Sequence, residues 1–314
     1  MKPNFLVTHS GGFHADELCS SVILTGLFPG AQIVRSRAQE WITPSDDRVI
    51  YDVGGTYNPD LHVFDHHQRN APMRPTGQPF SSFGLIWSHF GKAYLTQRGV
   101  IEEHLEDVFT NLDQSFVLPI DLLDNGAIDP STAGQLSALT LPNLLETLKP
   151  VFDTKTVDAE DIAFGEALKI ARVLIEAQVE QQSARLRAEA IVTQAVSATG
   201  SSKVLELPRG MPFYSAVRKA NAEHLLFVVH PRGQGDWTLG GIRLTDDGFD
   251  LRADLPREWA GLTNENLENA CGVRGATFCH NGRFIAAAKS REAILQMAAL
   301  AVEDAENRSQ QLQG

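Results

Sequence analysis

The chain has 314 residues, enough for two ordinary domains that each bury a core of their own. Hydrophobic residues make up 43% and charged residues 21%, which excludes a disordered or low-complexity chain. The formal net charge of −12 argues against a general polyanion-binding protein, because affinity for a duplex comes largely from Lys and Arg.

The three cysteines, Cys19, Cys271 and Cys279, form no CxxC pair, which argues against a disulfide scaffold and a thiolate zinc site. The N-terminus lacks the hydrophobic region of a signal peptide, and no apolar run reaches the roughly 20 residues that span a bilayer. We therefore expect a cytoplasmic protein that is not bound to a membrane.

The first part of the chain alternates β-like runs with helical segments. Apolar runs at Phe5 to Thr8, Gln32 to Arg35, Val49 to Gly54 and Leu61 to Asp65 predict strands, and Ala15 to Leu27 predicts a helix. This alternation is typical of an α/β fold with a parallel sheet.

Further helices follow a polar loop. The segment FSSFGLIWSHFG predicts a buried helix capped by Ser81 or Ser82, and we also predict both serines as substrate contacts. From about Val157 to Val196 there is no proline, and apolar residues recur at helical spacing, which predicts a long connecting helix.

Beyond residue 200 the pattern changes to β-like pieces such as KVLEL, LLFVVH and RFIAAA, followed by a helix from about Ser290. We therefore predict an α/β domain over 1–155, a helical connector over 156–199 and a smaller mixed α/β domain over 200–314.

Potential metal ligands stand where the predicted strands end. His9 follows the first strand, Asp52 the third, and Asp65, His66 and His67 the fourth. The carboxyl ends of parallel strands meet at one edge of a sheet, so these side chains should converge. Singly, each has a simpler interpretation, such as a turn-forming role for Asp52.

Two more segments add candidates. In THSGGFHADE a Gly-Gly turn leads to His14 and Asp16 at a helix start, where Asp16 could also serve only the helix dipole. In IDLLDNG both Asp121 and Asp124 are possible ligands, and the choice between them stays open.

Imidazole and carboxylate ligands without thiolates suit Mn²⁺, Mg²⁺, Co²⁺ or Zn²⁺, with Mn²⁺ the best match to mixed nitrogen and oxygen ligands. Six or more ligands exceed what one catalytic ion needs. Two ions about 3.5 to 4 Å apart can clamp the attacking and leaving oxygens of a phosphoryl displacement. The set therefore predicts two metals per chain and a phosphoesterase.

The sequence resembles the DHH phosphoesterase superfamily and, within it, the family of the melanocyte proliferating gene exonuclease. The resemblance rests on THSGGFHADE, YDVGG, FDHHQR, IDLLDNG, LPREWAGLTNENL and GATFCHNGRFIAAAKSRE, spaced over nearly the whole chain. It implies a DHH-type catalytic domain at the N-terminus and a substrate-binding domain at the C-terminus.

The resemblance also implies individual roles. His9 and His14 would hold one metal, Asp16, His66 and Asp124 the other, with Asp52 bridging both. Asp65 would orient a neighbouring ligand, and His67 would face the substrate phosphate, so Asp52, Asp65 and His67 are the predicted catalytic residues. His14 stands where the wider superfamily usually has an aspartate.

In the C-terminal domain, the resemblance implies phosphate contacts for His280, Lys289 and Arg291. Ala286 and Ala287 replace a glycine pair that such domains normally carry in the last strand, and their methyl groups hinder close approach of a ligand to the backbone.

The leading function is a phosphodiesterase or exonuclease acting on RNA, DNA ends or short oligonucleotides. A pyrophosphatase or small-nucleotide phosphatase is one alternative, and a non-catalytic nucleotide-binding protein is another. The sequence does not decide the substrate, the cleavage polarity or the oligomeric state.

Overall fold

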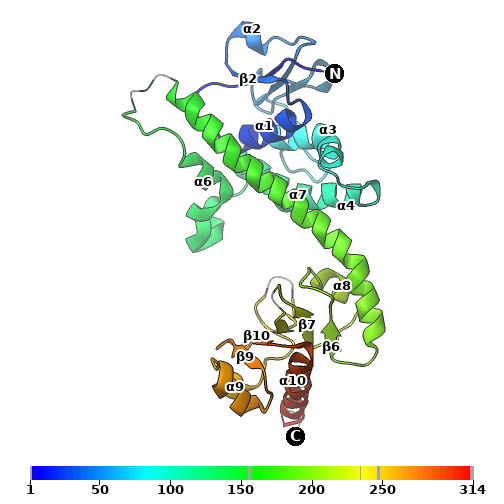
Figure 1. Cartoon of the computed structure of the whole chain (residues 1–314). Helices are drawn as coiled ribbons and strands as arrows, with labels where there is room; N and C mark the ends of the chain where they lie inside the picture. The colour runs from blue at the N-terminus through cyan, green and yellow to red at the C-terminus, as the bar shows by residue number, and fades with distance from the viewer. Residues whose placement is uncertain (1, 155, 157, 234, 246–247, 312–314) are drawn as a thin grey trace. The chain divides into compact units, whose positions relative to one another are not determined.

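A computed structural model describes residues 2–154, 156, 158–233, 235–245 and 248–311 (Figure 1). The chain divides into two compact units, Met1–Ser183 and Ala184–Gly314. The predicted domain boundary at residue 155 lies outside the described residues. Among the described helices, none is long and apolar enough to cross a membrane.

The first unit is built on a five-stranded sheet with the order β2-β1-β3-β5-β4. Strands β2, β1, β3 and β5 run parallel, which confirms the predicted α/β class, and β4 is antiparallel to β5. The strands are β1 (Phe5–Thr8), β2 (Gln32–Arg35), β3 (Arg48–Tyr51), β4 (Tyr57–Asn58) and β5 (Val63–Phe64).

Two predicted strands are shorter than expected. Strand β3 ends at Tyr51 because the next residue, Asp52, has a left-handed φ of 57°. The predicted strand from Leu61 to Asp65 is reduced to β5, because Leu61 ends the 3-10 turn η1 (Pro59–Leu61) and His62 is left-handed with a φ of 56°. The antiparallel strand β4 was not predicted.

Helices α1 (Ala15–Leu27) and α3 (Ser82–Gln97) pack tightly on each other, since a Cβ atom on Gly26 would lie 2.6 Å from the Tyr94 ring. The predicted cap is confirmed, because the Ser81 hydroxyl accepts a hydrogen bond from Phe83 N. The remaining elements up to residue 146 are α2 (Gln39–Ile42), α4 (Glu102–Leu112), the π-helical turn η2 (Asp113–Val117), α5 (Leu118–Asp124), the 3-10 segment η3 (Pro130–Leu139) and α6 (Leu141–Glu146).

Helix α7 (Ala159–Thr199) covers most of the predicted connecting helix, whose first residue, Val157, lies outside the described residues. The division between the two units falls within this helix, after Ser183. Phe164 and Ala171 are buried in its first part, and Val192 and Val196 join a core of the second unit. Two different cores therefore stabilise the two ends of one helix.

The second unit contains a sheet with the order β6-β7-β8-β10-β9, in which only β6 and β7 are parallel. Alternate residues of β7 point to opposite faces. Phe227 and Val229 join a core with α10, whereas Val228 joins a core with α8 and the end of α7. The elements are β6 (Val204–Glu206), α8 (Tyr214–Lys219), β7 (Phe227–Pro231), β8 (Trp237–Gly241), η4 (Arg257–Trp259), α9 (Asn264–Cys271), β9 (Ala276–Cys279), β10 (Ile285–Ala288) and α10 (Arg291–Gln311).

A pair of helical glycines tests the packing of the first unit. A Cβ atom on Gly84 would lie 2.1 Å from Asp121 Oδ2, whereas one on Gly165 in α7 would meet nothing within 4 Å. We expect Gly84→Ala to lower the free energy of unfolding by about 1–3 kcal/mol through overpacking. Gly165→Ala should raise it by about 0.5–1 kcal/mol, because alanine favours the helix. Thermal denaturation of both variants measures the difference, and equal midpoints would contradict this packing.

Candidate metal centre

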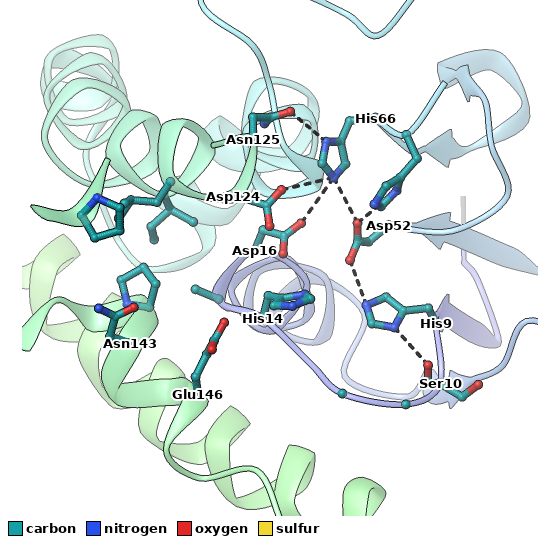
Figure 2. Close-up of a pocket in the computed structure, with 18 of the residues that line it drawn as sticks. His9, Ser10, His14, Asp16, Asp52, His66, Asp124, Asn125, Asn143 and Glu146 are labelled. Atoms are coloured by element: carbon teal, nitrogen blue, oxygen red, sulfur yellow. Dashed lines mark hydrogen bonds and ion pairs between the residues drawn. The ribbon is translucent and has the colours of Figure 1, made fainter. Parts of the chain in front are cut away.

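Three adjacent strands deliver the centre of the site. His9 follows β1, Asp52 follows β3 and His66 comes two residues after β5, so all three lie at the carboxyl edge of the sheet. Asp52 stands between the two imidazoles (Figure 2). Its Oδ2 lies 3.1 Å from His9 Nε2, and its Oδ1 lies 3.3 Å from His66 Nε2.

Two helices complete the centre. Asp16 is in the first turn of α1, close behind the N-cap residue His14, and Asp124 is the last residue of α5. His66 Nε2 lies 3.3 Å from Asp124 Oδ2 and 4.0 Å from Asp16 Oδ2. One ligand atom from each of His14, Asp16 and Asp124 lies within 4.8 Å of the other two. The structure thus brings together all six predicted metal ligands.

Three buried polar atoms in this centre make no well-aligned hydrogen bond among the described residues: Asp16 Oδ1, Asp52 Oδ1 and His66 Nε2, the last two being an ion pair at 3.3 Å. Buried polar atoms are nearly always paired, because leaving them unpaired costs free energy. Carboxylate oxygens and imidazole nitrogens are ligands for hard and borderline divalent cations. The donor set therefore fits such cations.

The backbone at Asp52 adopts a conformation that most residues avoid. Its φ of 57° is left-handed, a region in which Asp and Asn are among the few tolerated side chains besides glycine. The carboxylate is also almost completely buried, with 3% exposure. Unusual backbone geometry is often found where a side chain must be held in one orientation.

Asp65 holds the two histidines that follow it in the sequence through hydrogen bonds. Its Oδ1 accepts hydrogen bonds from His66 N at 2.8 Å and from His67 Nδ1 at 2.7 Å, and its Oδ2 accepts one from Gly55 N at 2.5 Å. The His67 side chain is 60% exposed, unlike the buried His66. Asp65 therefore orients both histidines while His67 stays accessible from the pocket.

The predicted substrate contacts of Ser81 and Ser82 need correction. Both serines are fully buried, with 0% exposure, so neither can touch a substrate. Ser82 Oγ donates to Asp16 Oδ2 at 2.7 Å, and Ser81 Oγ donates to Asp121 Oδ1 at 2.7 Å. Ser82 thus orients a candidate ligand, and Ser81 stabilises the start of α3.

The two aspartates of IDLLDNG face different surroundings. Asp121 accepts hydrogen bonds from Ser81 Oγ, from Gly84 N at 3.0 Å and from Arg74 Nη2 at 2.7 Å. These partners satisfy both of its oxygens away from the imidazoles. Asp124 is the aspartate that faces His66.

Glu17 was not identified from the sequence. It is fully buried, its Oε1 lies 3.2 Å from His9 Nε2, and both its oxygens accept from His14 N at 2.9 Å. It also lies within 4.8 Å of both Asp16 and Asp52 through its ligand atoms. The available signal was an acid three residues after the N-cap, which by itself indicates only a capping box.

Burial and crowding shift the pKa values of the centre. Burial raises the pKa of Asp124 to about 9, with the charge of Asp16 adding to the effect. Burial lowers the pKa of His66, but Asp52 and the other carboxylates outweigh this and raise it to about 9. Burial would raise the pKa of Asp52, but hydrogen bonds from His66 and His9 lower it to about 2.

These shifts predict a pH-dependent metal affinity. Without metal, Asp124 and His66 hold protons near pH 7, because both pKa values are raised to about 9. A cation must displace these protons, so the Mn²⁺ affinity should rise with pH, by about tenfold per pH unit for each proton displaced. Calorimetric titrations at pH 6 to 8 in buffers of different ionisation enthalpy measure both the affinity and the protons released. An affinity independent of pH would contradict this protonation scheme.

The predicted phosphate contacts of the second unit have mixed surroundings. Arg291 forms two hydrogen bonds to Glu206, at 2.6 and 2.7 Å, so its guanidinium is already engaged. His280 and Lys289 are exposed, and the His280 ring lies 4.2 Å from the Phe284 ring. Ala286 and Ala287 are buried in β10. The substrate role of these residues stays a prediction.

Comparisons with known proteins identify relatives of the whole chain. An MYG1 exonuclease from Mus musculus is 30% identical over 324 residues, covering 95% of this chain and 84% of that protein. An MYG1 protein from Schizosaccharomyces pombe is 30% identical, covering 96% and 98%. An MYG1 protein from Chlamydia trachomatis is 30% identical, covering 92% and 93%.

The crystal structure of RecJ in complex with Mn²⁺ from Thermus thermophilus is similar with a TM-score of 0.26 and 19% identity, and it matches 95% of this chain. The match spans 52% of the RecJ chain. Residues 5–302 match the family MYG1_exonuc, described as Uncharacterised protein family (UPF0160). With this match and three relatives at 30% identity, the chain belongs to the MYG1 exonuclease family.

Proposed function

We propose that this protein is a divalent-metal-dependent phosphoesterase of the DHH type, acting as a phosphodiesterase or exonuclease on RNA, DNA ends or short oligonucleotides. The observation that carries the proposal is the convergence of buried carboxylates and imidazoles on Asp52, in which Asp16 Oδ1, Asp52 Oδ1 and His66 Nε2 make no well-aligned hydrogen bond. The names of the MYG1 exonucleases support the substrate class.

The proposed ligands divide around Asp52. His9 and His14 would hold one cation and Asp16, His66 and Asp124 the other, with Asp52 shared by both. The opposite placement of the His9 and His66 nitrogens around the Asp52 carboxylate supports this division. Mn²⁺ is the proposed metal, and Mg²⁺, Co²⁺ or Zn²⁺ can use the same donors.

When bound, two divalent cations neutralise charge on the phosphoryl oxygens and acidify a water for in-line attack. The protein's own residues provide orientation and a proton. His67 Nδ1 is held by Asp65 Oδ1, which leaves Nε2 for the substrate. The hydrogen bond to Asp65 raises the pKa of His67, which favours the protonated ring.

In hydrolysis, the water oxygen forms a bond to phosphorus while the phosphorus–oxygen ester bond breaks. We propose that His67 Nε2 donates its proton to the leaving oxygen, and that the water's proton passes to solvent. The exposure of His67 beside buried Asp52 suits this role, because the ring can reach a substrate that its buried neighbours only hold in place.

Turnover on a panel of substrates tests the proposal. Purified protein with Mn²⁺ is given pyrophosphate, a nucleoside monophosphate and labelled RNA and DNA oligonucleotides of two to about ten residues. We expect release of mononucleotides, abolished by a chelator and restored by Mn²⁺. Turnover of pyrophosphate alone would favour a pyrophosphatase. Metal binding without any turnover would favour a non-catalytic nucleotide-binding protein.

A further inference from the structure

The metal centre forms only one side of a larger cavity. The cavity has a volume of about 740 Å³ and is also lined by residues of α5, η3 and α6. Figure 2 shows Asn143 and Glu146 of α6 away from Asp52. This volume lies in the range of pockets that enclose whole small-molecule ligands. An inorganic phosphate or pyrophosphate at the metal centre would leave the far side empty.

The far side of the cavity combines apolar and polar side chains. Leu123, Pro130 and Pro142 line it, together with Asn143 and Glu146. Inorganic anions have no apolar surface to bury against such residues, and the Glu146 carboxylate repels them. A nucleoside offers both an apolar face and neutral polar groups, so it matches this wall.

The two polar residues of the wall present hydrogen-bond acceptors. Asn143 Nδ2 donates to Ser137 O at 2.6 Å, which fixes the amide and leaves Oδ1 as the free acceptor. The Glu146 carboxylate lies 3.5 Å from Lys149 Nζ and keeps a side-chain exposure of 48%. These two acceptors favour a ligand that carries hydrogen-bond donors. The sugar hydroxyls and base amino groups of a nucleoside are such donors.

Arg37 is the one arginine or lysine among the described residues that line the cavity. It follows β2, whose end runs beside the end of β1, since Ser36 N donates to Thr8 O at 2.7 Å. No hydrogen bond or ion pair holds Arg37 within the described part of the chain. A free guanidinium beside a carboxylate-rich centre is suited to bind a phosphate through two parallel hydrogen bonds.

We infer that the cavity binds a nucleotide unit in two places at once. The terminal nucleoside lies against Leu123, Pro130 and Pro142, and Arg37 binds a phosphate next to the one that is cleaved. This inference rests on the proposed function and refines it: the site should prefer substrates that carry a nucleoside and a second phosphate beside the one that is cleaved.

Dinucleotides test the role of Arg37. One dinucleotide has a single phosphodiester, and two others carry an additional terminal phosphate at the 5′ or the 3′ end. One of the two dinucleotides with a terminal phosphate should have the lower KM with the parent protein. For that substrate, Arg37→Ala should raise KM by about 10- to 100-fold, as expected for charge-assisted hydrogen bonds. The KM of the unphosphorylated dinucleotide should change by less than about threefold, and kcat should stay constant for both.

Two variants serve as controls. Arg37→Lys keeps the charge without the planar fork and should recover part of the lost affinity. Arg98→Ala removes the same charge from a surface ion pair with Glu176, outside the cavity, and should leave KM unchanged. An equal rise in KM for all three dinucleotides, or no rise, would overturn the assigned role of Arg37.

Equilibrium binding tests, without requiring turnover, whether Leu123, Pro130 and Pro142 form a wall that binds the nucleoside (the nucleoside wall). The parent protein should bind a nucleoside 5′-monophosphate at least about tenfold more tightly than ribose 5-phosphate, because the base buries apolar surface. Pro142→Ser should reduce this ratio several-fold and leave ribose 5-phosphate binding unchanged. Equal affinities in the parent would overturn the nucleoside wall even if hydrolysis is observed. An intact ratio without hydrolysis of any substrate would instead contradict the proposed function alone.

Discussion

Asp52→Asn should abolish nearly all metal-dependent turnover while leaving the fold intact. Asparagine keeps the size of the side chain and tolerates the left-handed backbone of residue 52, whose φ is 57°. It removes the negative charge that lies between His9 and His66 at 3.1 and 3.3 Å. The loss in kcat/KM should exceed the roughly 10- to 100-fold typical of residues that only support a metal ligand.

The control for this variant is Asp47→Asn, which removes a surface charge paired with Arg48 at 2.9 Å. Its activity should equal that of the parent, because exposed ion pairs contribute little. The thermal midpoint of metal-free Asp52→Asn should fall, because a carboxyl whose pKa is lowered to about 2 stabilises the fold at neutral pH, but the protein should stay folded at the assay temperature. A well-folded Asp52→Asn protein with turnover within a few-fold of the parent would rule out the bridging role and would favour a simple turn residue.

Asp121→Asn and Asp124→Asn should have opposite effects, although the residues are one helical turn apart in α5. Burial raises the pKa of Asp121 to about 6, which means that the buried site disfavours the charged carboxylate. Removing it leaves the buried Arg74 charge with only Asp113, at 2.6 Å, as its partner. Breaking such a buried pair should cost about 3 kcal/mol and lower the thermal midpoint by roughly 6–12 °C.

For Asp124→Asn we expect an unchanged thermal midpoint near pH 7 without metal, because burial raises the pKa of Asp124 to about 9 and the carboxyl is then as neutral as the amide that replaces it. The Mn²⁺ affinity should instead fall by at least about tenfold. Differential scanning calorimetry and Mn²⁺ titration of the two variants separate the effects. Loss of metal affinity in Asp121→Asn with an unchanged midpoint would reverse the assignment.

The convergence of His9 and Asp52 at the strand ends could be predicted from sequence because two local signals coincide. Apolar runs end at His9 and Asp52, and parallel strands bring their carboxyl ends to one edge. The parallel sheet follows from the alternation of strands and helices, and the pairing of β1 with β3 places the two residues side by side. Both signals, the apolar runs and the alternation of strands with helices, are local in the sequence and do not depend on tertiary contacts.

Other features depend on tertiary contacts that the sequence does not reveal. Asp121 and Asp124 look alike until Arg74, 47 residues before Asp121, selects the first as its partner. Ser81 and Ser82 appear accessible at a helix start, yet both are buried against aspartates. Pro142 looks like a helix-start residue in the sequence, and only the packing of α6 against α1 and η3 makes it part of a cavity wall.

Counting the bound metal tests the central claim most directly. The protein is stripped of metal, loaded with Mn²⁺ and analysed by elemental analysis, and its crystals are measured at the manganese absorption edge. We predict two Mn²⁺ ions per chain, one on each side of the Asp52 carboxylate, with His9 and His66 on different ions. A chain with no bound ion, or with ions that do not contact Asp52, would contradict the account.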